Sequence, residues 1–280
     1  MCDSGTSRRD ILRVLVGVTV FAAVGPGEAS EARVERLIAQ TRGIDKISQR
    51  IDFISAALRG TRYRQYTLIG GPKQPEKFVV RDDAFDCVTY CETVLATSLS
   101  QDIGEFEGTL REIRYRNGIV NWFERNHYFF EWSRNNVANK ICREIVLDGS
   151  VPLEKTVYWH RELGRRRFSM VVTPSTILLA NKHKLATGDI IGFVTRRPNL
   201  DYFHVGFIAF DSAGTLLLRH ASLSNYRVLD ERMERFMTKN HVRYVTLLRP
   251  EQPTAAALAH KTEDLSRDQF WLHFRRVVVH

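Results

Sequence analysis

Hydrophobic residues recur at helical spacing through the first half of the chain. One apolar stripe runs along residues 44–59 and consists of Ile47, Ile51, Ile54 and Leu58. A shorter helix is predicted over 33–43, and Gly43 and Gly60 are expected to end the two helices. Residues 106–116 predict another helix, whereas 69–77 is rich in Gly, Pro and Lys and predicts a surface loop.

The hydrophobic pattern changes beyond residue 150. Short β-branched or apolar runs, bounded by Gly, Asp and Pro, predict strands over 156–160, 168–172, 189–194, 203–210, 215–219 and 242–248. A helix is expected between them, over 174–185. A helical first half followed by a strand-rich second half predicts an α+β fold with a mostly antiparallel sheet.

The stretch from Asp82 to Ala96 predicts a helix that starts beside a cysteine. Asp83 or Asp86 can act as the N-cap, and Cys87 then lies in the first turn. Free N–H groups and the helix dipole stabilise a thiolate there, so we expect a pKa for Cys87 well below about 8.5. A cysteine on an amphipathic helix is more often a core residue, as expected for Cys91 one turn later.

Two histidines stand on the two strands of a predicted hairpin, His204 before the turn and His220 after it. A symmetric four-residue turn over 211–214 sets His204 opposite Ala221 and puts the imidazoles on opposite faces. A three-residue loop with a glycine bulge sets His204 opposite His220 on one face. In that second register, a cysteine, a base and an orienting group can form one site.

Composition and charge restrict the classes of partner. The chain has 280 residues, 44% of them hydrophobic and 26% charged, as in an ordinary globular protein. Its formal net charge of +9 favours anionic partners. Nucleic acid is not expected, because the sequence has no glycine-rich phosphate loop, zinc-finger spacing or basic helix with interleaved aromatics.

The N-terminus predicts export. Ser7-Arg8-Arg9-Asp10-Ile11-Leu12-Arg13 resembles a twin-arginine signal, and the apolar run 14–24 and a small-residue stretch follow it. That run is too short to cross a bilayer, so no stable membrane anchor is expected. Cleavage is expected after Ala32, or else after Ser30, and the mature protein would be periplasmic or extracellular. The sequence leaves open whether Cys91 pairs with Cys142 there.

Several motifs resemble one known family. They are Phe85-Asp86-Cys87-Val88-Thr89-Tyr90, Tyr115-Arg116-Asn117-Gly118, Arg125-Asn126-His127-Tyr128-Phe129, Gly188-Asp189-Ile190-Ile191, His204-Val205-Gly206 and His220-Ala221-Ser222. Over roughly 44–250, the chain resembles exported N-acetylmuramoyl-L-alanine amidase-like proteins of the NlpC-type branch of papain-like cysteine hydrolases. Thr61-Arg62-Tyr63 departs from the usual G-x-P-Y turn, and Cys91 stands where an aliphatic residue is usual.

The resemblance implies a papain-like fold, a cysteine nucleophile at Cys87, a base at His204 and an orienting residue at His220, with no cofactor. It also implies a cell-wall muropeptide substrate. Residues expected to line the substrate cleft are Tyr63, Asp86, His127, Trp132 and Ser222. The expected organisation is a signal peptide (1–32), a papain-like amidase domain (33–250) and a C-terminal tail (251–280).

The sequence therefore predicts an exported cysteine amidase that cleaves peptidoglycan between N-acetylmuramic acid and L-alanine. An endopeptidase of the same fold, cutting inside the stem peptide, fits the same chemistry. Two other classes are open. Cys87 and Cys91, one turn apart, could bind zinc together with the two histidines. A catalytically silent module could bind the cell wall through its basic charge alone.

Overall fold

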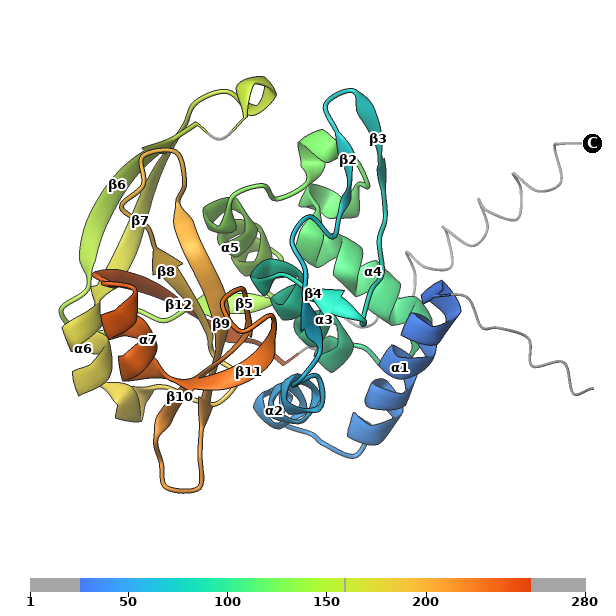
Figure 1. Cartoon of the computed structure of the whole chain (residues 1–280), viewed down its shortest axis with the longest axis horizontal. Coiled ribbons are helices and arrows are strands. Elements are labelled where there is room, and N and C mark those ends of the chain that lie inside the picture. Colours follow the sequence, from blue (N-terminus) through green and yellow to red (C-terminus); the bar gives the residue numbers. More distant parts are fainter. Residues whose placement is uncertain (1–25, 159, 253–280) are drawn as a thin grey trace, which may run out of the picture.

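The computed structural model describes residues 26–158 and 160–252. Most of its helices gather on one side of a curled sheet, and two short ones cover the other side (Figure 1). The α-helices are α1 (Pro26–Thr41), α2 (Ile47–Ala57), α3 (Cys87–Leu99), α4 (Ile103–Arg114), α5 (Phe129–Ala138), α6 (Ser175–Ala180) and α7 (Met233–Lys239). Short 3₁₀ helices are η1 (Arg116–Gly118), η2 (Trp122–Glu124), η3 (Arg161–Leu163) and η4 (Lys182–Lys184).

The sheet is mixed but mostly antiparallel. Its strands run in the order β4-β1-β11-β10-β9-β8-β12-β7-β6, with β5 also paired to β12. Only β1 and β4 pair in parallel among the strands of this sheet that the structure describes. The strands are β1 (Arg62–Tyr63), β4 (Ala84–Phe85), β5 (Cys142–Glu144), β6 (Val151–Val157), β7 (Arg166–Pro174), β8 (Ile190–Val194), β9 (Tyr202–Phe210), β10 (Leu216–Ser222), β11 (Arg227–Arg232) and β12 (Tyr244–Pro250).

Each face of the sheet has its own hydrophobic core. On the side of α1–α5, residues such as Tyr90, Leu95 and Trp132 pack against Val205 and Phe207 of β9. On the other side, Ile208 and Leu218 pack under α6 and α7. Successive residues of a strand point to opposite faces, so neighbouring positions of β9 and β10 enter different cores. Helix α3 is buried along most of its length, which fixes its first turn against the sheet.

The expected helical first half and strand-rich second half are both seen, but the stretch 69–77 is not a loop. It forms a hairpin of β2 (Ile69–Gly71) and β3 (Gln74–Lys77), which projects beside η1 and α4. The buried carboxylate of Glu76 holds this hairpin, because it accepts hydrogen bonds from Arg125 Nη2 at 2.5 Å and Tyr115 Oη at 2.9 Å. Two of the motifs that carry the family resemblance therefore have a structural role here.

The two ends of the chain are only partly described. The twin-arginine motif and nearly all of the C-terminal tail lie outside the described residues. Helix α1 already begins at Pro26, so the predicted cleavage after Ala32 falls inside this helix. Within the described ranges, no helix is both long and apolar enough to cross a membrane.

Candidate functional site

Cys87 is the first residue of α3, and Asp86 is its N-cap. Asp86 Oδ1 accepts hydrogen bonds from the backbone N–H of Val88 at 3.0 Å and of Thr89 at 2.8 Å. The Thr89 hydroxyl in turn accepts from the Asp86 backbone N–H at 3.0 Å, which completes a capping box. Of the two predicted caps Asp86 is therefore correct, whereas Asp83 pairs with Arg81.

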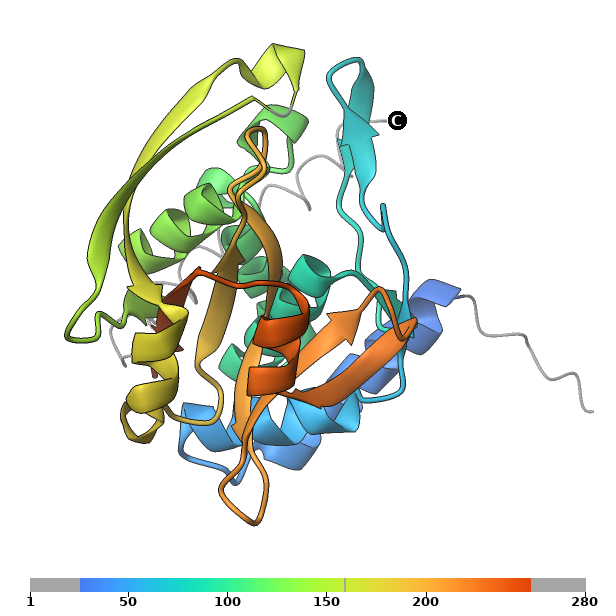
Figure 2. The ribbon, with the colours of Figure 1, turned by 60° about the vertical axis from the view of Figure 1, so that its left-hand side comes forward.

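His204 and His220 lie on one face of the sheet and touch. The His204 Nε2 atom is 2.6 Å from His220 Nδ1, and the rings are perpendicular with centroids 4.7 Å apart. The Phe236 ring packs against both histidines, at 5.3 Å and 5.4 Å between centroids. Phe236 belongs to α7, the helix that lies in front of the sheet in Figure 2. The pair therefore sits under an apolar side chain, which strengthens the polar contact between the rings.

Neither predicted register of the hairpin is seen. Asp211 and Thr215 close a loop that contains only residues 212–214, with Gly214 at a φ of 73°. Leu218 then pairs with Ile208 and Arg219 with Phe207, and continuing this pairing sets His220 opposite Gly206. A Cβ atom at Gly206 would lie 3.0 Å from His220 Cβ and 2.8 Å from a Leu218 methyl carbon. The histidines are thus diagonal neighbours, and a glycine at position 206 gives the imidazole its room.

Cys87 lies beside the strand that carries His204. The ladder between β9 and β10 ends at Phe207 and Arg219, and α3 packs against β9 next to this point. The backbone N–H of Val205 lies close enough to the Cys87 sulfur to lower its pKa, as do the amides of Cys87 and Val88. No hydrogen bond between Cys87 and His204 occurs among the described side chains. The contact with the Val205 amide therefore places the Cys87 sulfur next to β9, the strand that carries His204.

The prediction of a low thiol pKa is wrong. Burial raises the pKa of Cys87 to about 12, and the Asp86 carboxylate adds to this, outweighing the amides at the helix start. Burial and then the neighbouring His220 hold the pKa of His204 well below its usual range. Burial lowers the pKa of His220 to about 4. At neutral pH the site therefore contains a neutral thiol and two neutral imidazoles.

The structure places Tyr63 beside the sulfur. Strand β1 pairs in parallel with β4 so that Tyr63 lies opposite Phe85, two residues before Cys87. Burial, and then the proximity of Cys87 and Asp86, raise the pKa of the Tyr63 hydroxyl to about 12. Tyr63 is half-buried, so it can both contact the nucleophile and reach a bound molecule.

Three other residues predicted to line the cleft have structural partners in this fold. Trp132 is fully buried and stacks on Phe129 at 5.1 Å, so its prediction as a cleft residue is wrong. Ser222 is 2% exposed, and its hydroxyl accepts a hydrogen bond from Asn225 Nδ2 at 3.0 Å in the turn after β10. The His127 ring packs on Trp122 with its Nε2 atom 2.6 Å from the Trp122 carbonyl oxygen.

One residue at the site is absent from the sequence prediction. Glu231 of β11 has its Oε2 atom 3.6 Å from His220 Nε2. The charged run Arg227–Arg232 does not look like a strand, although the polar turn 222–225 after β10 is a signal for a returning one. The other two cysteines of the described residues, Cys91 and Cys142, are buried free thiols, so the disulfide between them that the sequence leaves open is not formed.

The zinc alternative has no ligand set among the residues that the structure describes. No three His, Cys, Asp or Glu side chains there are grouped so that they could hold a metal ion. His204 and His220 instead direct ring nitrogens at each other. The arrangement places a thiol beside the strand that carries one of two touching imidazoles.

We expect Cys87 to react with iodoacetamide slowly at pH 7 and faster with each rise in pH up to pH 10. The thiolate is the reactive form, and a pKa of about 12 keeps its fraction small over this range. The measurement is the alkylation rate of Cys87 by mass spectrometry between pH 6 and 10, with the buried Cys91 as internal control. A rate that levels off below pH 8.5 would show a thiolate–imidazolium pair instead.

Comparisons with known proteins address the fold and the family. The structure is similar to a crystal structure of a Legionella pneumophila protein, at 20% identity and a TM-score of 0.70 over 82% of this chain and 97% of that one. It is also similar to an N-acetylmuramoyl-L-alanine amidase from Bacteroides uniformis, at 22% identity and a TM-score of 0.58 over 74% of this chain and 99% of that one. No curated protein sequence matches the chain.

A family model provides the assignment. The AmiA-like model, described as N-acetylmuramoyl-L-alanine amidase-like, matches residues 53–245. This range contains Cys87, both histidines and Glu231, and it runs from within α2 to the start of β12. The chain belongs to the N-acetylmuramoyl-L-alanine amidase-like family.

Proposed function

We propose that this protein is a cysteine amidase of the NlpC-type papain-like class. In this proposal it cleaves the amide bond between N-acetylmuramic acid and L-alanine in peptidoglycan. The observation that carries the proposal is the position of Cys87 at a helix start, beside the strand whose His204 contacts His220. Family membership supports an amide substrate from the cell wall.

The proposed reaction begins from the neutral thiol. His204 Nε2 faces His220, so Nδ1 is the nitrogen available to take the Cys87 proton. As the sulfur attacks the lactyl carbonyl carbon, the S–H proton passes to His204 and an S–C bond forms. The Cys87 backbone N–H at the helix start is one donor for the oxyanion.

The intermediate then collapses with transfer of this proton from His204 to the alanine nitrogen. The C–N bond breaks, the peptide leaves with a free amine, and the muramoyl group remains on Cys87 as a thioester. A water molecule, deprotonated by His204, hydrolyses this thioester, and the proton returns to the sulfur. His220 holds the His204 ring throughout.

Product analysis tests this proposal. Mass spectrometry of a muropeptide digest should show a lactyl-bearing disaccharide and an intact peptide with N-terminal alanine. The Cys87→Ala variant should release neither. Cleavage inside the stem peptide would favour the endopeptidase alternative, and undiminished products from the variant would remove Cys87 from the mechanism. Peptidoglycan binding without any products would favour a silent wall-binding module.

Export is part of the proposal. The paired Arg8 and Arg9 lie before an apolar run, and the net charge of +9 suits an envelope rich in anionic polymers. We expect the Arg8→Lys/Arg9→Lys variant to accumulate in the cytoplasm of a host with a twin-arginine translocase. Fractionation and immunoblotting check this, with a general secretory signal fused to the same chain as control. An undiminished periplasmic level for the variant would argue against twin-arginine transport.

A further inference from the structure

The Glu231 carboxylate lies at the far end of the histidine pair. Its Oε2 atom is 3.6 Å from His220 Nε2, while His220 Nδ1 is 2.6 Å from His204 Nε2. The Glu231 side chain is 14% exposed and that of His220 only 2%. The carboxylate therefore acts on the imidazole with little intervening solvent to screen it.

Strand register explains why Glu231, and not its neighbour, reaches His220. Leu218 pairs with Glu231 and His220 with Leu229, so Glu231 and His220 are diagonal neighbours on the same face of the sheet. Asp230 points to the opposite face, where both of its carboxylate oxygens accept hydrogen bonds from Arg219 at 2.7 and 3.0 Å. The two adjacent acidic residues thus have different ion-pair partners, although the charge of Asp230 also raises the pKa of His220 against the larger effect of burial.

The proton on His220 can be placed by the charge that faces it. The buried His220 Nε2 atom has no hydrogen-bond partner among the described residues. A neutral imidazole has one N–H and one lone pair, and a carboxylate is an acceptor only. A lone pair on Nε2 would face the negative carboxylate, whereas an N–H there is attracted to it. The proton therefore belongs on Nε2, and Nδ1 of His220 is an acceptor.

Through the contact between the rings, the tautomer of His220 also determines the tautomer of His204. Because His220 Nδ1 accepts, His204 Nε2 must be the donor, which leaves the lone pair of His204 on Nδ1. We propose that Glu231 is a positioning residue that fixes the tautomers of both histidines, so that His204 presents an unprotonated Nδ1 to the nucleophile. The tautomers follow from the geometry alone; their catalytic use rests on the proposed amidase function.

Ring-nitrogen spectroscopy tests the proposal without depending on turnover. In the full-length protein labelled with ¹⁵N-histidine, long-range ¹H–¹⁵N spectra at pH 7 should show Nε2–H for both His204 and His220. Glu231→Gln keeps the shape but replaces the carboxylate with an amide that can donate or accept, so a mixture of tautomers is expected. Muropeptide turnover should fall about 10- to 100-fold. Glu231→Asp, which restores the charge, should keep the wild-type tautomers.

Glu162→Gln is the matched control, because Glu162 faces a surface histidine, with Oε2 2.8 Å from His160 Nδ1. It should leave the His204 and His220 signals and the turnover unchanged. Wild-type tautomers in Glu231→Gln, or Nδ1–H on His220 in the wild type, would overturn the proposal. If Glu231→Gln does not fold, loss of the Nε2–H tautomers in folded Glu231→Asp would overturn it. Inactive wild-type protein with the expected tautomers would refute the amidase function and not the tautomer assignment.

Discussion

Replacing His204 by alanine is expected to lower the turnover of muropeptide by about 10²- to 10⁴-fold, the range over which a general base contributes. The neutral Cys87 thiol must lose its proton during attack, because burial and Asp86 keep its pKa near 12. His204 is on the strand whose Val205 amide meets the sulfur, and its ring is held by His220 on one side.

The measurement is kcat with a soluble muropeptide, together with a thermal melt to show that the variant is folded. His183→Ala provides the control, since His183 is exposed on η4 and far along the chain from the site. We expect that control to keep wild-type turnover. A loss of less than tenfold in folded His204→Ala would mean that solvent or another residue removes the proton, and the assignment of His204 as base would fail.

Breaking the ion pair between Glu92 and Arg114 is expected to cost about 3–5 kcal/mol of unfolding free energy. Both side chains are 3% exposed, and Arg114 Nε donates to Glu92 Oε2 at 2.7 Å. Arg114 Nη1 also donates to the Val79 carbonyl oxygen at 2.7 Å. Glu92→Gln changes the helix that begins with Cys87, and it would leave the buried guanidinium of Arg114 in α4 without its counter-charge.

Urea denaturation of Glu92→Gln, Arg114→Met and the double variant Glu92→Leu/Arg114→Met measures the effect. The double variant should be more stable than either single one, because it leaves no unpaired charge in the core. Arg111→Ala is the control: its pair with Glu107 is 37% exposed on both sides and should change stability by less than about 1 kcal/mol. Single variants no less stable than the control would contradict the expectation.

The sequence predicts local structure well at the nucleophile. An aspartate followed by a cysteine and an apolar helical stripe indicates the start of α3, because capping depends on residues only three apart. The two strands with histidines and the turn between them are also local signals. To predict that His204 and His220 share a face, the exact length of the loop between their strands must be known. The sequence of a short polar turn does not determine that length uniquely. The observed loop, residues 212–214, shifts the register by two residues from the predicted contact.

The pattern of hydrophobic and polar residues does not predict features that depend on packing between distant parts of the chain. Trp132 belongs to an aromatic stretch that could equally line a cleft, and only the packing of α5 on the sheet buries it. Strand β11 lacks the hydrophobic alternation of an ordinary strand. Its Asp230 and Glu231 point to opposite faces of the sheet, where they pair with the buried Arg219 and His220. The sequence predicts a lowered pKa for the Cys87 thiol, whereas the pKa is raised, because a helix start does not reveal whether the side chain is buried.

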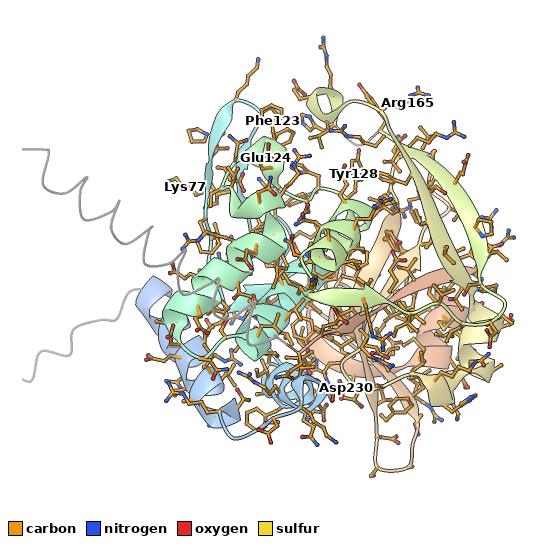
Figure 3. The ribbon with its side chains drawn as sticks, turned by 180° about the vertical axis from the view of Figure 1, so that it is seen from behind. Lys77, Phe123, Glu124, Tyr128, Arg165 and Asp230 are labelled. Atoms are coloured by element: carbon orange, nitrogen blue, oxygen red, sulfur yellow. The ribbon has the colours of Figure 1, made fainter. Side chains whose placement is uncertain are left out.

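Three residues at one end of the molecule decide which face of β10 carries the histidine. Loop 212–214 lies at the end of the β9–β10 hairpin (Figure 1), and β10 carries His220 on one face and Arg219 on the other. An insertion or deletion of one residue there would exchange the two faces. The guanidinium would then enter the apolar core under α7, away from Asp230, which Figure 3 labels near α2. A relative with all the site residues but a loop one residue longer would have an intact motif and no active site.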